Sequence, residues 1–533
     1  MKHTHFKILT AAAMAILATT ACTKKLDLSP TNDITAAIVY NNPAGYKQAL
    51  AKVYGAMALT GNTGGVGSAD IPSQILSDEG NSDFLRGFWY LQTLSTDEAG
   101  WTYHGNTDPL GIHQMSWSSI NQTVAGAYYR SYFQIALCND FIREASDGNL
   151  GSRGITGASA DSIRKYKAEA RYLRAFQYWV LMDMFANPPM VTEATPIASG
   201  LPKQIARKDL FTYVESELLA VQADLLPAKT NEYGRVDQAA AWALLARIYL
   251  NAGIYTGTTR YTDCITYCNK AINAGYTLHS KYAELMLADN NLNTDEFIFA
   301  IPYDGTHTQN WGGTTTLVHG PAGVPASVSG LSGSWGCIRV TQQLVGLFDA
   351  NDMRGQFYTS GQNLIMANLL DVSTDGYSSS KFRNVTRSGG PAPNKDPAGN
   401  WSDVDFPLFR LGEVYLNYAE AVLRGGTGGD VATALGYVNK LRTRGYNNST
   451  SGNITSSALT TDFILDERAR ELFWEGLRRT DLIRYNKFTT AAYLWAWKGG
   501  VVNGTAVDSK YNIFPIPSTD LTANPNLVQN PGY

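Results

Sequence analysis

The sequence predicts a mainly α-helical protein in which pairs of helices pack against an irregular half that is rich in loops. Apolar residues recur at helical spacing along much of the 533-residue chain. With 44% hydrophobic and 17% charged residues, the composition is typical of a chain that folds around a large core. Two stretches, at about 61–119 and 304–404, are instead rich in Gly, Ser, Thr, Asn, Asp and Pro, and this predicts long loops.

Amphipathic helices are predicted mostly in adjacent pairs. We expect them at residues 46–59, 127–145, 162–185, 210–225, 238–252, 262–274, 411–424, 431–444 and 461–485. In the last segment Glu467 precedes Arg470, and Glu475 precedes Arg478 and Arg479, at the spacing of neighbours on a helix. Because such neighbours pair locally, we interpret these charges as structural.

Two segments fit the W-x2-L-G-x2-Y pattern that opens a tetratricopeptide repeat. The matching residues are Trp242, Leu245, Ala246 and Tyr249 in one segment and Leu408, Leu411, Gly412 and Tyr415 in the other. Large and small apolar residues at this spacing let paired helices nest, and stacked pairs form a superhelical scaffold. Ordinary helix packing would explain the same residues and stays open as the alternative.

The first 21 residues have the features of a secretory signal. Lys2 and Lys7 are followed by a short apolar run that ends at Cys22 and is too short to span a membrane. Cleavage before Cys22 would leave a cysteine for lipid attachment, although Thr19 stands where such signals usually have Leu. Simple secretion is the alternative. No low-complexity linker interrupts residues 22–533, which we expect to form a single unit.

Charge and cysteine content exclude two further classes. The formal net charge is -3 and no basic stripe is present, so nucleic acid is not expected as a partner. Besides Cys22 the chain has Cys138, Cys264, Cys268 and Cys337, too few for a disulfide framework. Cys264 and Cys268 are four residues apart on a predicted helix, a geometry that suits a disulfide poorly. We expect buried thiols.

A candidate sugar-binding segment lies in the first loop-rich stretch. Trp101 and Tyr103 stand two residues apart, Asn106 and Asp108 follow, and Arg86 precedes them. A sugar ring presents C–H groups that lie against an aromatic face, and its hydroxyls need donors and acceptors such as the amide of Asn and the guanidinium of Arg. This combination of side chains therefore suits a carbohydrate.

The second loop-rich stretch adds Trp311 in NWGGTT and Trp335 in GSWGC. The flanking glycines let a large ring stand in an exposed loop. Core packing is the alternative for each of these aromatic rings.

Several segments resemble sequence of the SusD/RagB family, the surface glycan-binding lipoproteins of Bacteroidetes. They are AEARYLRAFQYWVLMDMFANPPMV at 168–191, LFRLGEVYLNYAEAVLR at 408–424, DERARELFWEGLRRTDLIRY at 466–485 and FPIPSTDLTANPNLVQNPGY at 514–533. The resemblance covers essentially the whole chain and is densest after Pro407. Within the family, the chain looks most like the starch-binding branch.

The resemblance implies a right-handed superhelix of tetratricopeptide-like helix pairs packed against a ligand-binding half. It also implies a surface-exposed lipoprotein of the outer membrane, anchored through Cys22. Such a protein captures α-glucan, as starch or maltooligosaccharide, and passes it to a SusC-like TonB-dependent transporter. A different glycan, or a scaffold that binds only proteins, remains an alternative.

Site residues follow from the same resemblance. Trp101, Trp311 and Trp335 match by position an arc of aromatic residues that follows the curve of an α-glucan. Tyr103 is expected as an accompanying ring, and Arg86 and Asn106 match its polar contacts.

A structural calcium site is a further expectation. Asp289, Asp403 and Asp405 supply hard oxygen ligands in loop-like sequence, and similar aspartates bind calcium in starch-type relatives. Carboxylates that only cap turns are the alternative.

No enzyme is expected, and no cofactor for catalysis. Glycoside hydrolysis needs two carboxyl groups that face the scissile bond, and sequence proximity does not show such an arrangement. The candidates near the proposed site are Asp78, Glu79, Asp83, Asp97 and Glu98. No H-E-x-x-H motif, nucleophile elbow or phosphate loop is present, and the histidines are expected to be hydrogen-bonding loop residues.

Overall fold

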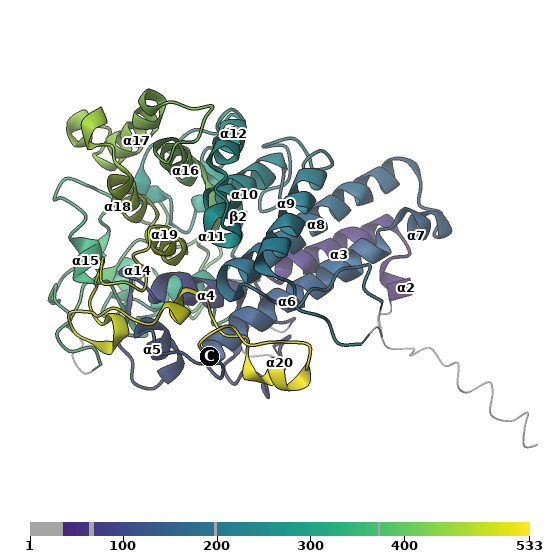
Figure 1. Ribbon diagram of the computed structural model, residues 1–533, viewed down its shortest axis with the longest axis horizontal. Helices are drawn as coiled ribbons and strands as arrows, with labels where there is room; N and C mark the ends of the chain where they lie inside the picture. Colours follow the sequence, from purple (N-terminus) through teal and green to yellow (C-terminus); the bar gives the residue numbers. More distant parts are fainter. Residues whose placement is uncertain (1–35, 63–68, 197–199, 371–373) are drawn as a thin grey trace, which may run out of the picture.

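The computed structural model describes residues 36–62, 69–196, 200–370 and 374–533, and these residues are mainly helical (Figure 1). This confirms the predicted fold class. The expected signal at 1–21 and Cys22 lie outside the described residues. In the part of the chain that is described, no helix combines the length and apolar character needed to cross a bilayer.

The helical half is a succession of packed helices. They are α3 (Pro43–Gly55), α6 (Gln122–Glu144), α8 (Gly157–Phe185), α9 (Arg207–Val221), α10 (Gln238–Leu250), α12 (Tyr261–Ile272), α16 (Leu411–Leu423) and α17 (Val431–Gly445). Helix α8 packs on both α6 and α9, α10 packs on α12, and α16 packs on both α12 and α17, so the helices form a continuous row (Figure 1). The right-handed sense of a superhelix stays a prediction.

The two repeat-like openings have different outcomes. Leu245, Ala246 and Tyr249 are buried on α10, as the pattern requires. In the second match Leu408 lies in a strand and the helix begins only at Leu411, so that match is wrong at its first position. The strand carries Arg410 into the core, where it forms ion pairs that a helix beginning earlier would not allow.

The helix expected at 461–485 is interrupted. Helix α18 (Thr461–Leu472) and α19 (Arg478–Arg484) are separated by a segment in which Trp474 and Gly476 have φ values of 65° and 74°. The helix is interrupted because three tertiary hydrogen bonds hold this segment. The Trp474 backbone N–H donates to Glu98 Oε2 over 2.8 Å, its indole donates to the Glu98 carbonyl, and the Trp89 indole donates to the Trp474 carbonyl. These bonds anchor the break to the first loop-rich stretch.

Beside this break lies a buried set of ion pairs, which we term the C-terminal ion network. Its members are Glu296, Asp352, Arg354, Lys381, Arg410, Arg442, Arg444, Glu467, Arg470, Glu471 and Glu475. The local pair Glu467–Arg470 is confirmed at 2.7 Å. The local pairing of Glu475 is wrong, because Glu475 binds Arg410 and Lys381 across the core while Arg478 and Arg479 bind Asp97 and Asp183.

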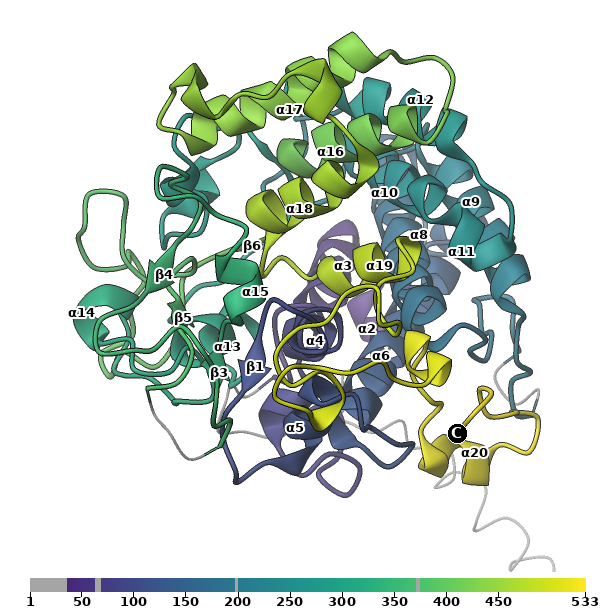
Figure 2. The same ribbon diagram turned by 60° about the vertical axis from the view of Figure 1, so that its left-hand side comes forward.

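Three two-stranded antiparallel sheets occur in the described residues (Figure 2). Strand β2 (Phe297–Ile301) pairs with β6 (Phe406–Arg410), and β4 (Phe357–Tyr358) pairs with β5 (Ser378–Ser379). The pair that matters for the site is β1 (Gly100–Trp101) with β3 (Ile338–Arg339), because it joins the two loop-rich stretches.

The loop-rich half also contains short helices that the pattern did not locate. Helix α4 (Phe84–Trp89) and α5 (Thr107–His113) lie in the first stretch, and α13 (Gly313–His319) lies in the second. The thiols of Cys138, Cys264, Cys268 and Cys337 are buried and not in disulfides, as expected.

Candidate functional site

Three tryptophans gather in the second loop-rich stretch. The ring centroid of Trp311 is 6.1 Å from that of Trp335 and 4.3 Å from that of Trp401. The ring of His319 stacks on Trp335, nearly parallel to it at a centroid distance of 4.9 Å. Trp311 and Trp335 are half-buried, whereas Trp401 is buried. We call these four residues the aromatic cluster.

Trp311 is held by its backbone. Its N–H donates to Glu79 Oε2 over 3.2 Å, and its carbonyl accepts from Arg86 Nη1 over 3.1 Å. The following Gly312 passes so close to Asp83 that a Cβ would lie 2.1 Å from the Cβ of that residue. The glycine therefore allows α13 to begin close against α4.

Arg86 does not offer a free guanidinium. It is buried, donates to Asp78 Oδ2 over 3.0 Å as well as to Trp311, and lies over the ring of Tyr90. The structure thus places Arg86 behind Trp311, where it positions that residue.

The loop that carries Trp335 is tied to the first loop-rich stretch. The Thr102 N–H donates to the Cys337 carbonyl over 2.9 Å, directly beside the β1–β3 pair. On the other side, the Trp335 N–H donates to the His319 carbonyl over 2.7 Å. Trp335 is therefore fixed between two segments, and both loop-rich stretches contribute to one surface.

Trp101 and Tyr103 differ sharply in exposure. Trp101 is 3% exposed, packs edge-on against Tyr90, and donates from its indole to the Tyr103 carbonyl over 2.8 Å. In this structure it packs against the loop and presents little surface to solvent, and its part in the aromatic arc stays an untested prediction. Tyr103 is 51% exposed and is the ring of this segment that faces solvent.

Asn106 has a local role. Its side-chain oxygen accepts the N–H of Asp108 over 3.2 Å, so it caps the start of α5.

Two residues of the cluster were not singled out from the sequence. Trp401 follows Asn400 in the same kind of Gly, Ser and Asn context that marked Trp311, and this was the available signal. His319 was expected to be a loop residue, but it ends α13, and its ring nitrogens contact the carbonyls of Gly333 and Asn400. Its stacking on Trp335 has no sequence signal.

The carboxylates near the aromatic cluster form hydrogen bonds and ion pairs with other parts of the protein. Glu79 binds the Trp311 N–H, and burial raises the pKa of its carboxyl to about 7. Asp83 accepts the N–H groups of Arg86 and Gly313, Asp97 pairs with Arg478, and Glu98 binds Trp474. None of these contacts forms a facing pair of the kind that glycoside hydrolysis requires.

The aspartates expected to bind calcium are engaged with protein donors. Asp289 pairs with Arg387 at 3.0 Å, Asp403 accepts the N–H groups of Gly305 and Asn394, and Asp405 accepts from Tyr233 and Tyr303. No three His, Cys, Asp or Glu side chains within the described ranges are grouped to hold a metal ion. The three carboxylates do not fit a calcium ion as arranged, and calcium binding stays an untested prediction.

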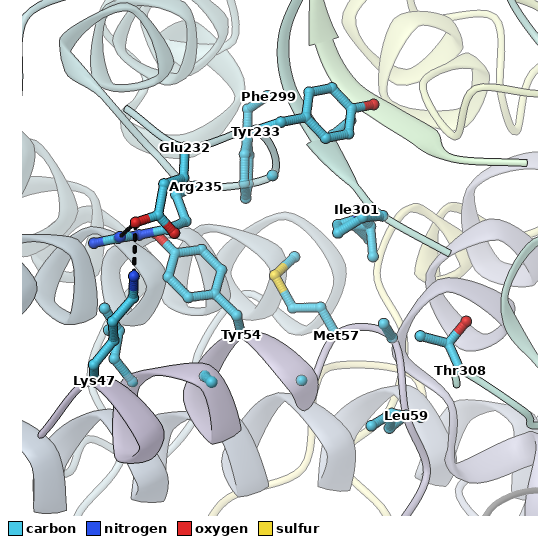
Figure 3. Close-up of a pocket in the computed structure, with 17 residues that line it drawn as sticks. Lys47, Tyr54, Met57, Leu59, Glu232, Tyr233, Arg235, Phe299, Ile301 and Thr308 are labelled. Atoms are coloured by element: carbon cyan, nitrogen blue, oxygen red, sulfur yellow. Dashed lines mark hydrogen bonds and ion pairs between the residues drawn. The ribbon is translucent and has the colours of Figure 1, made fainter. Parts of the chain in front are cut away.

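An apolar cavity of about 300 Å³ lies elsewhere, between α3 and β2 (Figure 3). Tyr54, Met57, Phe299 and Ile301 line it, together with Lys47 and Glu232, which form an ion pair of 2.8 Å. None of the expected sugar-binding residues reaches it. Because its walls offer little to sugar hydroxyls, the aromatic cluster is the better candidate site.

Comparison with known proteins agrees with this architecture. The model of the SusD family matches residues 350–533, and a model described as starch-binding and associating with the outer membrane matches residues 74–250. The starch-binding protein SusD of Bacteroides thetaiotaomicron is 34% identical, with 100% of both chains covered. A SusD-like protein of Bacteroides ovatus is 24% identical over 70% of this chain and 67% of its own.

Solved structures show the same fold. A SusD homologue from Bacteroides thetaiotaomicron superposes with a TM-score of 0.72 at 20% identity, covering 94% of this chain and 99% of that one. Surface glycan-binding protein A from the same organism, in complex with laminarihexaose, superposes with a TM-score of 0.68 at 20% identity, covering 91% and 99%. From the full-length relative and the two family matches together, the chain belongs to the SusD/RagB family.

Proposed function

We propose that this protein captures starch or maltooligosaccharide at the aromatic cluster and does not cleave it. The observation that carries the proposal is the pair of half-buried rings, Trp311 and Trp335, whose planes are inclined by 57° at a centroid distance of 6.1 Å. Inclined faces suit an α-glucan, because successive glucose rings in such a chain turn along a curve. The starch-binding relative at 34% identity supports the same ligand.

Binding is expected to be weak. If each of Trp311, Trp335 and Tyr103 contributes about 1.5 kcal/mol of burial and stacking, the sum only slightly exceeds the lower estimates of the cost of association. We propose a dissociation constant of about 0.1–1 mM, which corresponds to about 4–5.5 kcal/mol of net binding free energy. Hydrogen bonds to the sugar hydroxyls would have to supply most of it, beyond what the rings contribute. Such an affinity suits a protein that captures a glycan chain and passes it on.

Calorimetry tests the ligand. The protein without residues 1–22 is titrated with maltoheptaose and a cyclodextrin, and with cellohexaose as the control for linkage. Binding of the two α-glucans only, weakened about tenfold in Trp311→Ala and Trp335→Ala, is the expected result. Laminarihexaose is included because a similar structure holds it. Binding of laminarihexaose without α-glucan would replace starch with another glycan, and no binding of any polysaccharide would favour a protein-binding scaffold.

We propose further that the protein is anchored in the outer membrane by lipid at Cys22 and delivers glycan to a SusC-like TonB-dependent transporter. The description of the family match at residues 74–250 supports a location at the outer membrane. Labelling with a radioactive fatty acid, lost in Cys22→Ser, tests the anchor. Co-purification of a TonB-dependent barrel with the full-length protein tests the partner, and its absence under conditions that preserve the membrane complex would contradict delivery.

A further inference from the structure

A polar pocket of about 620 Å³ lies in the helical half, apart from the aromatic cluster. It is bounded by α16, α17 and the segment that follows α12. The residues used below are Tyr276, Tyr415, Lys440, Thr443, Arg444 and Asn448. Figure 2 shows α17 at the top of the molecule and α13, which ends in His319, towards the bottom left. The pocket is therefore separate from the proposed glycan site.

Arg444 lines this pocket with one donor unused. Two of its nitrogens bind Glu296 and Glu471 of the C-terminal ion network, but its Nε has no hydrogen-bond acceptor among the described residues. The residue is 5% exposed. A buried N–H of a cation that lacks an acceptor is costly. Because this Nε is itself closed to solvent, an acceptor in the pocket reaches it only with a small shift of the Arg444 side chain.

Lys440 supplies a second cation on the same face. It is one helical turn before Arg444 on α17, and residues four apart on a helix lie side by side. Lys440 is exposed and its ammonium lies 5.7 Å from the ring centroid of Tyr415, while no carboxylate in the described parts of the chain pairs with it. It is free to meet an anionic group.

The remaining wall is polar and uncharged except for His279. Asn, Ser and Thr side chains surround Lys440 and Arg444, and no Asp or Glu lines the pocket. Both ring nitrogens of His279 are occupied by Asp295 and Glu284, so this residue adds no free cation. Tyr415, which stacks on Tyr437 at 4.3 Å, supplies an apolar patch. The volume lies in the range of small-molecule sites.

We propose that this pocket binds an acidic sugar, with its carboxylate between Lys440 and Arg444 and its hydroxyls on the surrounding amide and hydroxyl groups. We infer a carboxylate on the ligand because Lys440 and Arg444 lie on one helix face and no acidic side chain among the described residues lines the pocket. We infer that the rest of the ligand is a sugar because Asn, Ser and Thr side chains line the pocket and can bond its hydroxyls. This site goes beyond the proposed capture of neutral α-glucan and does not depend on it.

Titration calorimetry of the purified protein with trigalacturonate, and with maltotriose as the neutral counterpart, tests the proposal. Trigalacturonate is expected to bind, and Lys440→Gln is expected to weaken it about tenfold, since one charge-assisted hydrogen bond is lost. Lys270→Gln is the matched control, because Lys270 is also an exposed lysine over a tyrosine ring on a helix. It is expected to change nothing.

Further arms separate the alternatives. Trp335→Ala is expected to retain trigalacturonate binding while binding α-glucan more weakly, so the two sites respond independently. If acetate bound as tightly as trigalacturonate, the inference that the ligand is a sugar would be wrong. If a tetraglutamate peptide bound in place of trigalacturonate, the pocket would be assigned to an acidic peptide. Absence of trigalacturonate binding, or equal effects of Lys440→Gln and Lys270→Gln, would overturn the proposal.

Discussion

In the C-terminal ion network each buried carboxylate meets arginine or lysine, whereas around the aromatic cluster the carboxylates meet mostly backbone N–H groups. As a result, the pKa values of carboxyl groups in the two regions are shifted in opposite directions. Paired with Arg354, Arg410 and Arg444, Glu471 has its pKa lowered to about 2. Half-buried beneath Trp311, Glu79 has its pKa raised to about 7 by desolvation.

Both regions contain buried polar atoms without a partner in the described residues, such as Arg444 Nε in the network. Beside the aromatic cluster, Asp83 Oδ2, Tyr303 Oη and Thr314 Oγ1 are buried and have no hydrogen-bond partner within the described residues. One region uses charge to fix where secondary structures meet. The other holds loops by a few backbone contacts and keeps ring faces near solvent. The proposed binding surface therefore lies on loops that are attached to the helical half.

The largest expected effect is the loss of a cation from the network. Arg410→Met removes one cationic partner from each of Glu296, Glu471 and Glu475, and removing one partner from buried ion pairs costs about 3–5 kcal/mol of unfolding free energy. Arg164→Met is the control, because its pairs with Asp147 and Asp161 are exposed and such pairs contribute about 0–1 kcal/mol. Urea unfolding measures both. Equal losses would show that the network is not a special source of stability.

The next effect separates the two aromatic residues of the first loop. Trp101→Ala is expected to lower the unfolding free energy by about 3 kcal/mol, because the ring is buried. Tyr103→Ala is expected to leave it within about 0.5 kcal/mol while weakening α-glucan binding. Thermal unfolding and calorimetry report the two quantities. Loss of binding with unchanged stability in Trp101→Ala would place Trp101 on the ligand surface.

Within the aromatic cluster, the half-buried Trp335 and the buried Trp401 are expected to differ in how their loss affects binding and stability. Trp335→Ala should weaken maltoheptaose binding about tenfold, as expected for about 1.4 kcal/mol of stacking and burial, and leave the melting temperature nearly unchanged. Trp401→Ala should lower the melting temperature as well, because its ring is buried beside Trp311. If Trp401→Ala reduced binding without any loss of stability, Trp401 would be a contact residue.

The smallest effect is on pH dependence, with opposite signs in the two regions. Glu79 has a raised pKa in the folded state, so its contribution to stability is complete below about pH 4.5 and is lost as pH rises through about 7. Glu471 has a lowered pKa, so its contribution is present above about pH 4.5 and is lost as pH falls towards 2.

Melting temperatures of the wild type and Glu79→Gln between pH 4.5 and 8 test the first of these signs. Glu98 and Asp405, whose pKa values are raised by burial to about 8 and 7, change stability in the same direction in both proteins. The difference between the two proteins therefore isolates Glu79. The melting temperature of Glu79→Gln should therefore fall less with rising pH than that of the wild type. A steeper fall in Glu79→Gln would contradict the assigned cause.

Much of the fold was predictable because helix periodicity is a local signal. Helices α8, α10, α12, α16 and α17 lie within a few residues of their expected positions. The break before α19 was not predictable, since its cause is Glu98, which is 376 residues from Trp474 in sequence. The site was predicted in part. Gly-rich context marked Trp311 and Trp335, but no local pattern distinguishes the buried Trp101 from the exposed Tyr103 two residues later.

The sequence by itself determined the family, the mainly helical class, most helix positions and the two stretches that carry the aromatic rings. These depend on spacing between neighbours and on whole-chain similarity. Only the tertiary structure decided that Tyr103 and not Trp101 faces solvent, that Trp401 and His319 support the site, and that Glu475 pairs with Arg410 and Lys381. Burial and ion pairing depend on which distant segments meet, and that information is not contained in local spacing.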